Sequence, residues 1–233
     1  MDTSSIRLVL EPPALDDRPV SRRLGLIVLA TDHTTERDFA RMLPRDEVQA
    51  YVARVPYANP TTPENLRLLQ PRLAEAAALI LPGEPLDALH FGCTSAVVAI
   101  GDEAVEAALQ AGKPGTPAVT PLSAARAALG TLGVRRISLL TPYTAETTAP
   151  MVGYFARHGF EVHGVTCFGL EDDRVMARVR PEAVLAAAVE ATAREAEGLF
   201  ISCTALRAAE VAQRIEDAIG RPVVTSNQAS VWR

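Results

Sequence analysis

Short apolar runs alternate along the chain with longer segments in which apolar residues recur at helical spacing. The runs predict buried strands at 24–30, 88–91, 135–141 and 198–202, and further strands at 47–57, 116–120, 160–168 and 221–225. The longer segments predict helices at 62–80 with a break before Pro71, at 95–112 ending at Gly112, and at 121–133, 145–159, 181–195 and 205–220. This regular alternation predicts an α/β protein with parallel sheets.

The two halves of the chain repeat each other. Cys93-Thr94 recurs as Cys203-Thr204, 110 positions later, and five residues between 27 and 36 are identical at the same offset. Any two βαβ units align through Leu, Val and Ala alone, but here polar residues and cysteines also keep the register. We therefore predict an N-terminal arm (1–19) and two similar lobes related by a pseudo-twofold axis, the first formed by 20–117 with 223–233 and the second by 118–222.

Each repeated cysteine follows an apolar strand and precedes a predicted helix. Ligands bind at this edge of open parallel sheets. A helix N-terminus there is expected to lower the thiol pKa below about 8.5 and to bind a carboxylate, with help from the hydroxyls of Thr94, Ser95 and Thr204. A lone buried cysteine indicates core packing, as we expect for Cys167. The repetition instead favours two thiols that act on opposite faces of one carbon.

Composition and charge exclude several classes of function. The formal net charge is −5 with no basic stripe, which argues against nucleic-acid binding. No apolar run approaches a membrane span, and no signal peptide is recognisable, so we expect a cytoplasmic protein with free thiols. A homo-oligomer is compatible with the sequence, although no interface stripe is visible.

Two acidic segments leave alternatives open. Asp32-His33 follows the first strand and is either an acid/base pair or a set of polar loop residues that caps the next helix. Glu171-Asp172-Asp173 either closes over a substrate or forms a solvated helix cap.

The segments FGCTSA (91–96), SCTALRA (202–208), TPYT (141–144), GLEDDRVMARV (169–179) and PVVTSNQASVW (222–232) together resemble the aspartate/glutamate racemase superfamily. The similarity is greatest to its maleate cis–trans isomerase and arylmalonate decarboxylase branch, and within it to the ectoine-utilisation protein. The resemblance spans residues 24 to 233. It implies two flavodoxin-like lobes with the active site in the cleft between them, no metal or coenzyme, and a small carboxylate as substrate.

The resemblance also implies roles for individual residues. Cys93 and Cys203 match the catalytic pair, in which the first cysteine adds to the substrate double bond and the second acts from the far side. Decarboxylases of the branch lack the first cysteine. The substrate-binding set corresponds to Tyr143, Thr94, Ser95, Thr204 and Ala205, together with Asp32 and His33.

One departure from the branch concerns the substrate. Maleate isomerases carry asparagine or another small polar residue where this chain has Asp32-His33. An acidic side chain there disfavours maleate and favours a substrate with a neutral or cationic end, such as an ectoine-derived compound. The resemblance thus implies a cofactor-independent two-cysteine isomerase or racemase of a small carboxylate, in ectoine or hydroxyectoine utilisation. The alternatives are an amino-acid racemase or epimerase, an arylmalonate-type decarboxylase, and a non-catalytic carboxylate-binding protein.

Overall fold

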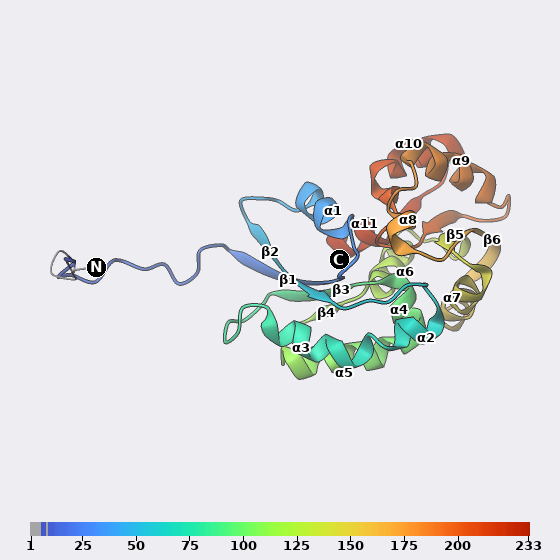
Figure 1. Cartoon of the computed structure of the whole chain (residues 1–233). Helices are drawn as coiled ribbons and strands as arrows, with labels where there is room; N and C mark the ends of the chain where they lie inside the picture. Colours follow the sequence, from blue (N-terminus) through green and yellow to red (C-terminus); the bar gives the residue numbers. More distant parts are fainter. Residues whose placement is uncertain (1–5, 8) are drawn as a thin grey trace.

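Two four-stranded parallel sheets form the centre of the protein in a computed structural model that describes residues 6–7 and 9–233 (Figure 1). The first sheet has the order β2-β1-β3-β4 and the second the order β6-β5-β7-β8. The strands are β1 (Arg22–Leu29), β2 (Val48–Val55), β3 (Ala88–Gly92), β4 (Ala118–Val119), β5 (Arg136–Tyr143), β6 (Glu161–Leu170), β7 (Gly198–Ile201) and β8 (Val223–Thr225). The matching strand orders confirm the predicted α/β fold with two similar lobes.

Helices cover the faces of both sheets, so the central strands β1, β3, β5 and β7 are largely buried. In Figure 1, α3 and α5 lie below the first sheet and α1 lies above it. The helices are α1 (Thr35–Met42), α2 (Pro63–Arg67), α3 (Gln70–Leu79), α4 (Thr94–Ile100), α5 (Asp102–Gly112), α6 (Pro121–Thr131), α7 (Ala145–Arg157), α8 (Asp173–Met176), α9 (Pro181–Ala191), α10 (Ala212–Ile219) and α11 (Ser226–Trp232).

Two predicted helices are each divided into two shorter ones. The segment 62–80 breaks at residues 68–69, just before Pro71, as predicted. The segment 95–112 was expected to be one helix, but it divides at Gly101, which ends α4 and precedes α5 with φ of 102°. Only glycine adopts this backbone conformation without strain, and it redirects the chain after a helix of two turns.

The predicted lobe boundaries change at both connections. Strand β4 pairs with β3 in the first sheet, and β8 pairs with β7 in the second, so residues 118–119 belong to the first lobe and 223–225 to the second. Helix α11 then returns to the first lobe, where it packs against α1. One continuous cluster of buried apolar residues extends through both lobes and includes both repeated cysteines. The lobes are therefore joined by a shared core.

The described part of the predicted N-terminal arm extends away from the lobes (Figure 1). Its base is connected to the first lobe by Arg18, which pairs with Asp87 at 3.3 Å. Residues 1–5 and 8 of this predicted arm lie outside the described residues. Among the helices described, none is both long and apolar enough to cross a membrane.

Helices α3 and α5 approach each other closely at Gly112. A Cβ atom there would collide with the carbonyl oxygen of Ala74 and lie 2.7 Å from the Cβ of Ala77. We expect Gly112→Ala to lower the free energy of unfolding by about 1–3 kcal/mol, as overpacking does elsewhere, in urea denaturation. Gly130→Ala in α6 is the control, because a Cβ atom added there would meet no other atom within 4 Å. Equal effects of the two substitutions would contradict the proposed close packing.

Candidate active site

Both repeated cysteines line one small cavity between the lobes, at the carboxyl ends of β1, β3, β5 and β7. The cavity has a volume of about 20 Å³, which is room for about one water molecule. A substrate therefore requires the lobes or a covering segment to move. Its lining comprises Leu29, Asp32, Tyr57, Thr61, Cys93, Thr94 and Ser95 from the first lobe, and Tyr143, Asp173, Met176, Cys203, Thr204 and Ala205 from the second.

Cys93 follows β3 and is the N-cap residue of α4, as predicted. Its sulfur lies 3.7 Å from Oγ of Ser95, and the backbone N–H of Ala96 acts to lower the pKa of the thiol. The first turn of α4 therefore directs a hydroxyl and a backbone donor toward this thiol, an arrangement suited to stabilising negative charge.

Cys203 lies in a different local structure from the one predicted. The expected helix over 205–220 is replaced by a turn, a 3-10 helix (Arg207–Glu210) and α10. Cys203 itself has φ of 95°, a conformation that is strained for a non-glycine residue. The N–H groups of Ala205 and Leu206 and the Tyr143 hydroxyl nevertheless act to lower the pKa of this thiol. The Tyr143 hydroxyl itself lies 3.3 Å from Oγ of Ser202.

Reciprocal hydrogen bonds connect the two Cys-Thr motifs. The Thr204 hydroxyl donates to the carbonyl oxygen of Gly92 at 2.9 Å. The hydroxyls of Thr94 and Ser226 are 2.9 Å apart, and Ser226 Oγ accepts the N–H of Cys203 at 3.1 Å. In this closed cavity both threonine hydroxyls bind protein atoms, so their expected contact with a substrate carboxylate stays a prediction. Sequence analysis did not single out Ser226, because only the folded chain brings it to both motifs.

Burial dominates the acidity of both thiols. It raises the pKa of Cys93 to about 11 and that of Cys203 to about 12, and the surrounding donors only partly oppose this effect. The expectation of a lowered thiol pKa is therefore wrong for the closed cavity. Removal of a thiolate from water outweighs the hydrogen bonds that favour the charged form. Burial likewise raises the pKa of Tyr143, which stays protonated and can donate to a sulfur anion.

Asp32 and His33 are neighbours in the sequence but line two different cavities. Asp32 lines the thiol cavity and accepts hydrogen bonds from the N–H groups of Thr34 and Thr35 at 2.9 and 2.8 Å. It therefore caps the start of α1, and burial raises its pKa. His33 is exposed and lines a neighbouring pocket, so the two side chains do not face the thiols as a pair.

Asp173 is a cavity residue that sequence analysis left between two interpretations. It is buried at the start of α8 and accepts hydrogen bonds from the Thr31 hydroxyl and, at 2.8 Å, from the Asn59 amide. These contacts hold α8 against the first lobe. For Asp173 they support the interpretation that this segment closes over the site, rather than that it forms a solvated helix cap. Asp172 instead caps α8 and pairs with Arg174.

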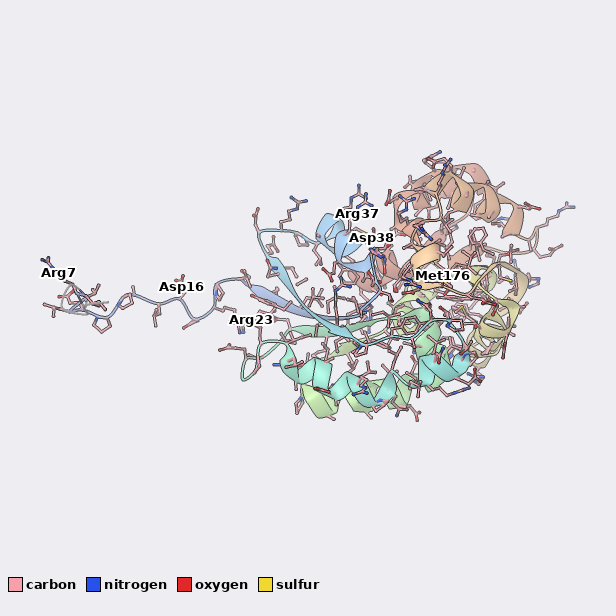
Figure 2. All side chains as sticks on the ribbon, viewed as in Figure 1. Arg7, Asp16, Arg23, Arg37, Asp38 and Met176 are labelled. Carbon is pink, nitrogen blue, oxygen red and sulfur yellow. The ribbon has the colours of Figure 1, made fainter. Side chains whose placement is uncertain are left out.

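Tyr57, Thr61, Met176 and Leu29 also line the cavity, and sequence analysis missed them. Tyr57 donates to the Thr61 hydroxyl at 2.8 Å, and the N–H of Thr61 reaches the Glu171 carbonyl at 2.6 Å. The segment 57–61 therefore covers the cavity from the first lobe as α8 does from the second. Figure 2 labels Met176, which lies on α8, and Arg37 and Asp38, which lie on α1. Within residues 6–7 and 9–233, no three His, Cys, Asp or Glu side chains form a metal site.

Comparisons with known proteins agree with this fold. The family profile of arylmalonate decarboxylase matches residues 99–233. A maleate isomerase from Geobacillus stearothermophilus is 23% identical over 226 residues, 91% of this chain and 89% of that protein. The crystal structure of a cysteine-to-alanine maleate isomerase from Pseudomonas putida S16 with maleate matches at a TM-score of 0.82 and 18% identity, covering 91% and 89% of the two chains. A Nocardia farcinica maleate cis–trans isomerase mutant with a covalently bound succinylcysteine intermediate matches at 0.81 and 21%, covering 91% and 90%.

The raised pKa values of the two thiols predict how the free energy of unfolding changes at alkaline pH. An unfolded thiol releases its proton near pH 8.5, whereas the folded thiols keep theirs to about pH 11 and 12. The free energy of unfolding should therefore fall as pH rises above about 8.5, by up to about 1.4 kcal/mol per pH unit for each thiol. Urea denaturation between these limits measures the slope, and the double variant Cys93→Ser, Cys203→Ser should show a shallower one. Identical slopes in the two proteins would contradict the assignment.

Proposed function

The chain belongs to the arylmalonate decarboxylase family, and from this premise we propose that it is a cofactor-independent isomerase of a small unsaturated carboxylate. The observation that carries the proposal is the pair of buried thiols, Cys93 and Cys203, in one cavity between the lobes. The similar maleate isomerases, one of them solved with a succinylcysteine intermediate, support cis–trans isomerisation.

The proposed reaction uses one thiol from each lobe. Cys93 transfers its proton to a cavity carboxylate, and its sulfur forms a bond to one carbon of the substrate double bond. The electron pair of that double bond takes a proton from Cys203 at the neighbouring carbon. Rotation about the resulting single bond precedes the reverse steps, in which Cys203 recovers its proton and the carbon–sulfur bond breaks. The N–H groups of Ala205 and Leu206 and the Tyr143 hydroxyl stabilise the Cys203 thiolate until it recovers its proton.

The proton on Cys93 sets a condition for this reaction. A pKa of about 11 leaves the thiol protonated at neutral pH in the closed cavity. Asp32 and Asp173 line the same cavity and are the carboxylates available to accept the proton. Burial raises the pKa of Asp32 above its ordinary value, which brings it closer to that of the thiol and eases the transfer.

We further propose that the substrate has a neutral or cationic end and belongs to ectoine or hydroxyectoine utilisation. The cavity lining contains two carboxylates and, among the described residues, no Lys, Arg or His. A second substrate carboxylate would therefore lie beside like charge in a cavity that excludes water, which is unfavourable. A neutral amide or an ammonium group would instead donate to these oxygens.

Decarboxylation is the second candidate, because the matching family profile is that of arylmalonate decarboxylase. The presence of Cys93 favours isomerisation, since the resembling decarboxylases lack the first cysteine. Release of carbon dioxide from malonate-type substrates, without isomerisation of any alkene, would support the decarboxylase instead.

The two thiols are tested by single substitutions. Cys93→Ser and Cys203→Ser should each lower turnover of maleate or its monoamide by about a thousandfold or more, measured by proton NMR, because each removes a reacting group. Cys203→Ser should also accumulate a covalent adduct on Cys93, visible by mass spectrometry. Cys167→Ser is the matched control, since Cys167 lies on β6 and does not line the cavity. Full activity in both cavity variants would overturn the proposal.

The role of the cavity carboxylates in substrate selection is tested by comparing kcat/KM for two substrates. We expect the native protein to have a higher kcat/KM for the monoamide of maleate than for maleate. Asp173→Asn removes one negative charge, so it should shift this ratio toward maleate by about tenfold. Asp217→Asn on the exposed face of α10 is the control and should leave the ratio unchanged. A native preference for maleate that Asp173→Asn does not alter would contradict the role of the carboxylates.

A further inference from the structure

A second pocket lies beside the thiol cavity, also between the lobes. It has a volume of about 580 Å³, far larger than the cavity itself. Helix α1 contributes Arg37, and the region around α8 contributes Arg174 and Arg178. The lining as a whole comprises His33, Thr34, Arg37, Asp172, Arg174, Ala177, Arg178 and Arg207. We call it the arginine pocket.

The arginine pocket is strongly cationic within an acidic protein. Its lining holds four guanidinium groups and one carboxylate, although the chain has a formal net charge of −5. Asp172 pairs with Arg174 at 2.5 Å, and Glu210 pairs with Arg37 at 3.2 Å. Arg178 and Arg207 form no salt bridge with any of the residues described.

The two remaining arginines have unused hydrogen-bonding capacity. Arg178 is exposed and forms no ion pair within the described chain. Arg207 donates from Nη2 to the carbonyl oxygen of Val179 at 3.1 Å, and its buried Nε has no partner among the described residues. A guanidinium group offers parallel donors that match carboxylate and phosphate oxygens. The lining therefore has both the charge and the donors for an anion.

Only a thin wall separates the arginine pocket from the thiol cavity. At three places consecutive residues line opposite sides of it: Asp32 and His33, Asp172 and Asp173, and Met176 and Ala177. A hydrogen bond of 2.7 Å from the Thr34 hydroxyl to the Ala205 carbonyl crosses it. The same short helix, α8, thus holds the thiol cavity closed through Asp173 and presents Arg174 to the pocket.

We propose that the arginine pocket is an anion-binding site for the carboxylate or phosphate group of a small ligand, at the approach to the thiol cavity. The two sites divide the charges: carboxylates surround the thiols, and guanidinium groups line the adjoining pocket. An anionic group that the carboxylates of the thiol cavity would repel binds instead in the adjoining arginine pocket. This proposal concerns binding, and it stands or fails independently of the proposed reaction.

Calorimetric titration with inorganic phosphate and with succinate tests the site without any turnover. The native protein should bind at least one of these anions saturably, and Arg178→Gln should weaken that binding by about tenfold through loss of one guanidinium group. Because Arg178 is exposed and forms no ion pair, this variant should fold normally. Arg72→Gln, which removes an exposed arginine of α3, is the matched control and should bind like the native protein.

The two anions distinguish the possible sources of the ligand. Competition between phosphate and succinate, with both weakened by Arg178→Gln, identifies a site for organic acids as well as phosphate. If Arg178→Gln weakens the binding of phosphate alone, the site serves a separate phosphate ligand. If it weakens the binding of succinate alone, the site serves a carboxylate. The proposal is overturned if neither anion binds saturably, if Arg178→Gln binds like the native protein, or if Arg72→Gln weakens binding equally.

Discussion

The hydrogen bonds that join the two Cys-Thr motifs are the constraint on which the rest of the site depends. Thr204 reaches the carbonyl before Cys93, and Ser226 connects Thr94 to the backbone of Cys203. All of these groups are buried, so each would lose a partner and leave a polar atom unsatisfied if the lobes slid past one another. The contacts therefore hold the carboxyl ends of β3 and β7 together and bring two thiols from distant parts of the chain into one cavity.

Closure of that cavity decides its chemistry. Exclusion of water makes the thiols weak acids, yet the same exclusion strengthens the hydrogen bonds that receive a thiolate once one forms. Helix α8 and the segment 57–61 provide the cover, through contacts of Asp173 with Thr31 and Asn59. Burial behind this cover is also what raises the pKa of both sulfurs, so the same contacts that exclude water set the acidity of the thiols.

The charges around the junction of the lobes are segregated. Two carboxylates line the thiol cavity, while four guanidinium groups line the pocket on the other side of a thin wall. Neighbouring residues in the sequence, such as Asp32 and His33, contribute to different compartments because the chain turns between β1 and α1 and directs successive side chains differently.

The sequence by itself determined the α/β fold, the presence of two similar lobes and the identity of the two candidate cysteines. Strand and helix periodicity and the internal repeat can all be read along the chain without knowledge of tertiary contacts. It also placed Gly112 at the end of a helix and Cys93 at the start of one. The positive φ of Cys203 and the 3-10 helix after it could not be predicted, since packing between lobes imposes them against local preference. Only the tertiary structure decided the raised thiol pKa values, the burial of Asp173 and the linking role of Ser226. Each of these depends on which distant groups exclude water from the site, and desolvation and long-range hydrogen bonds are properties of the folded chain.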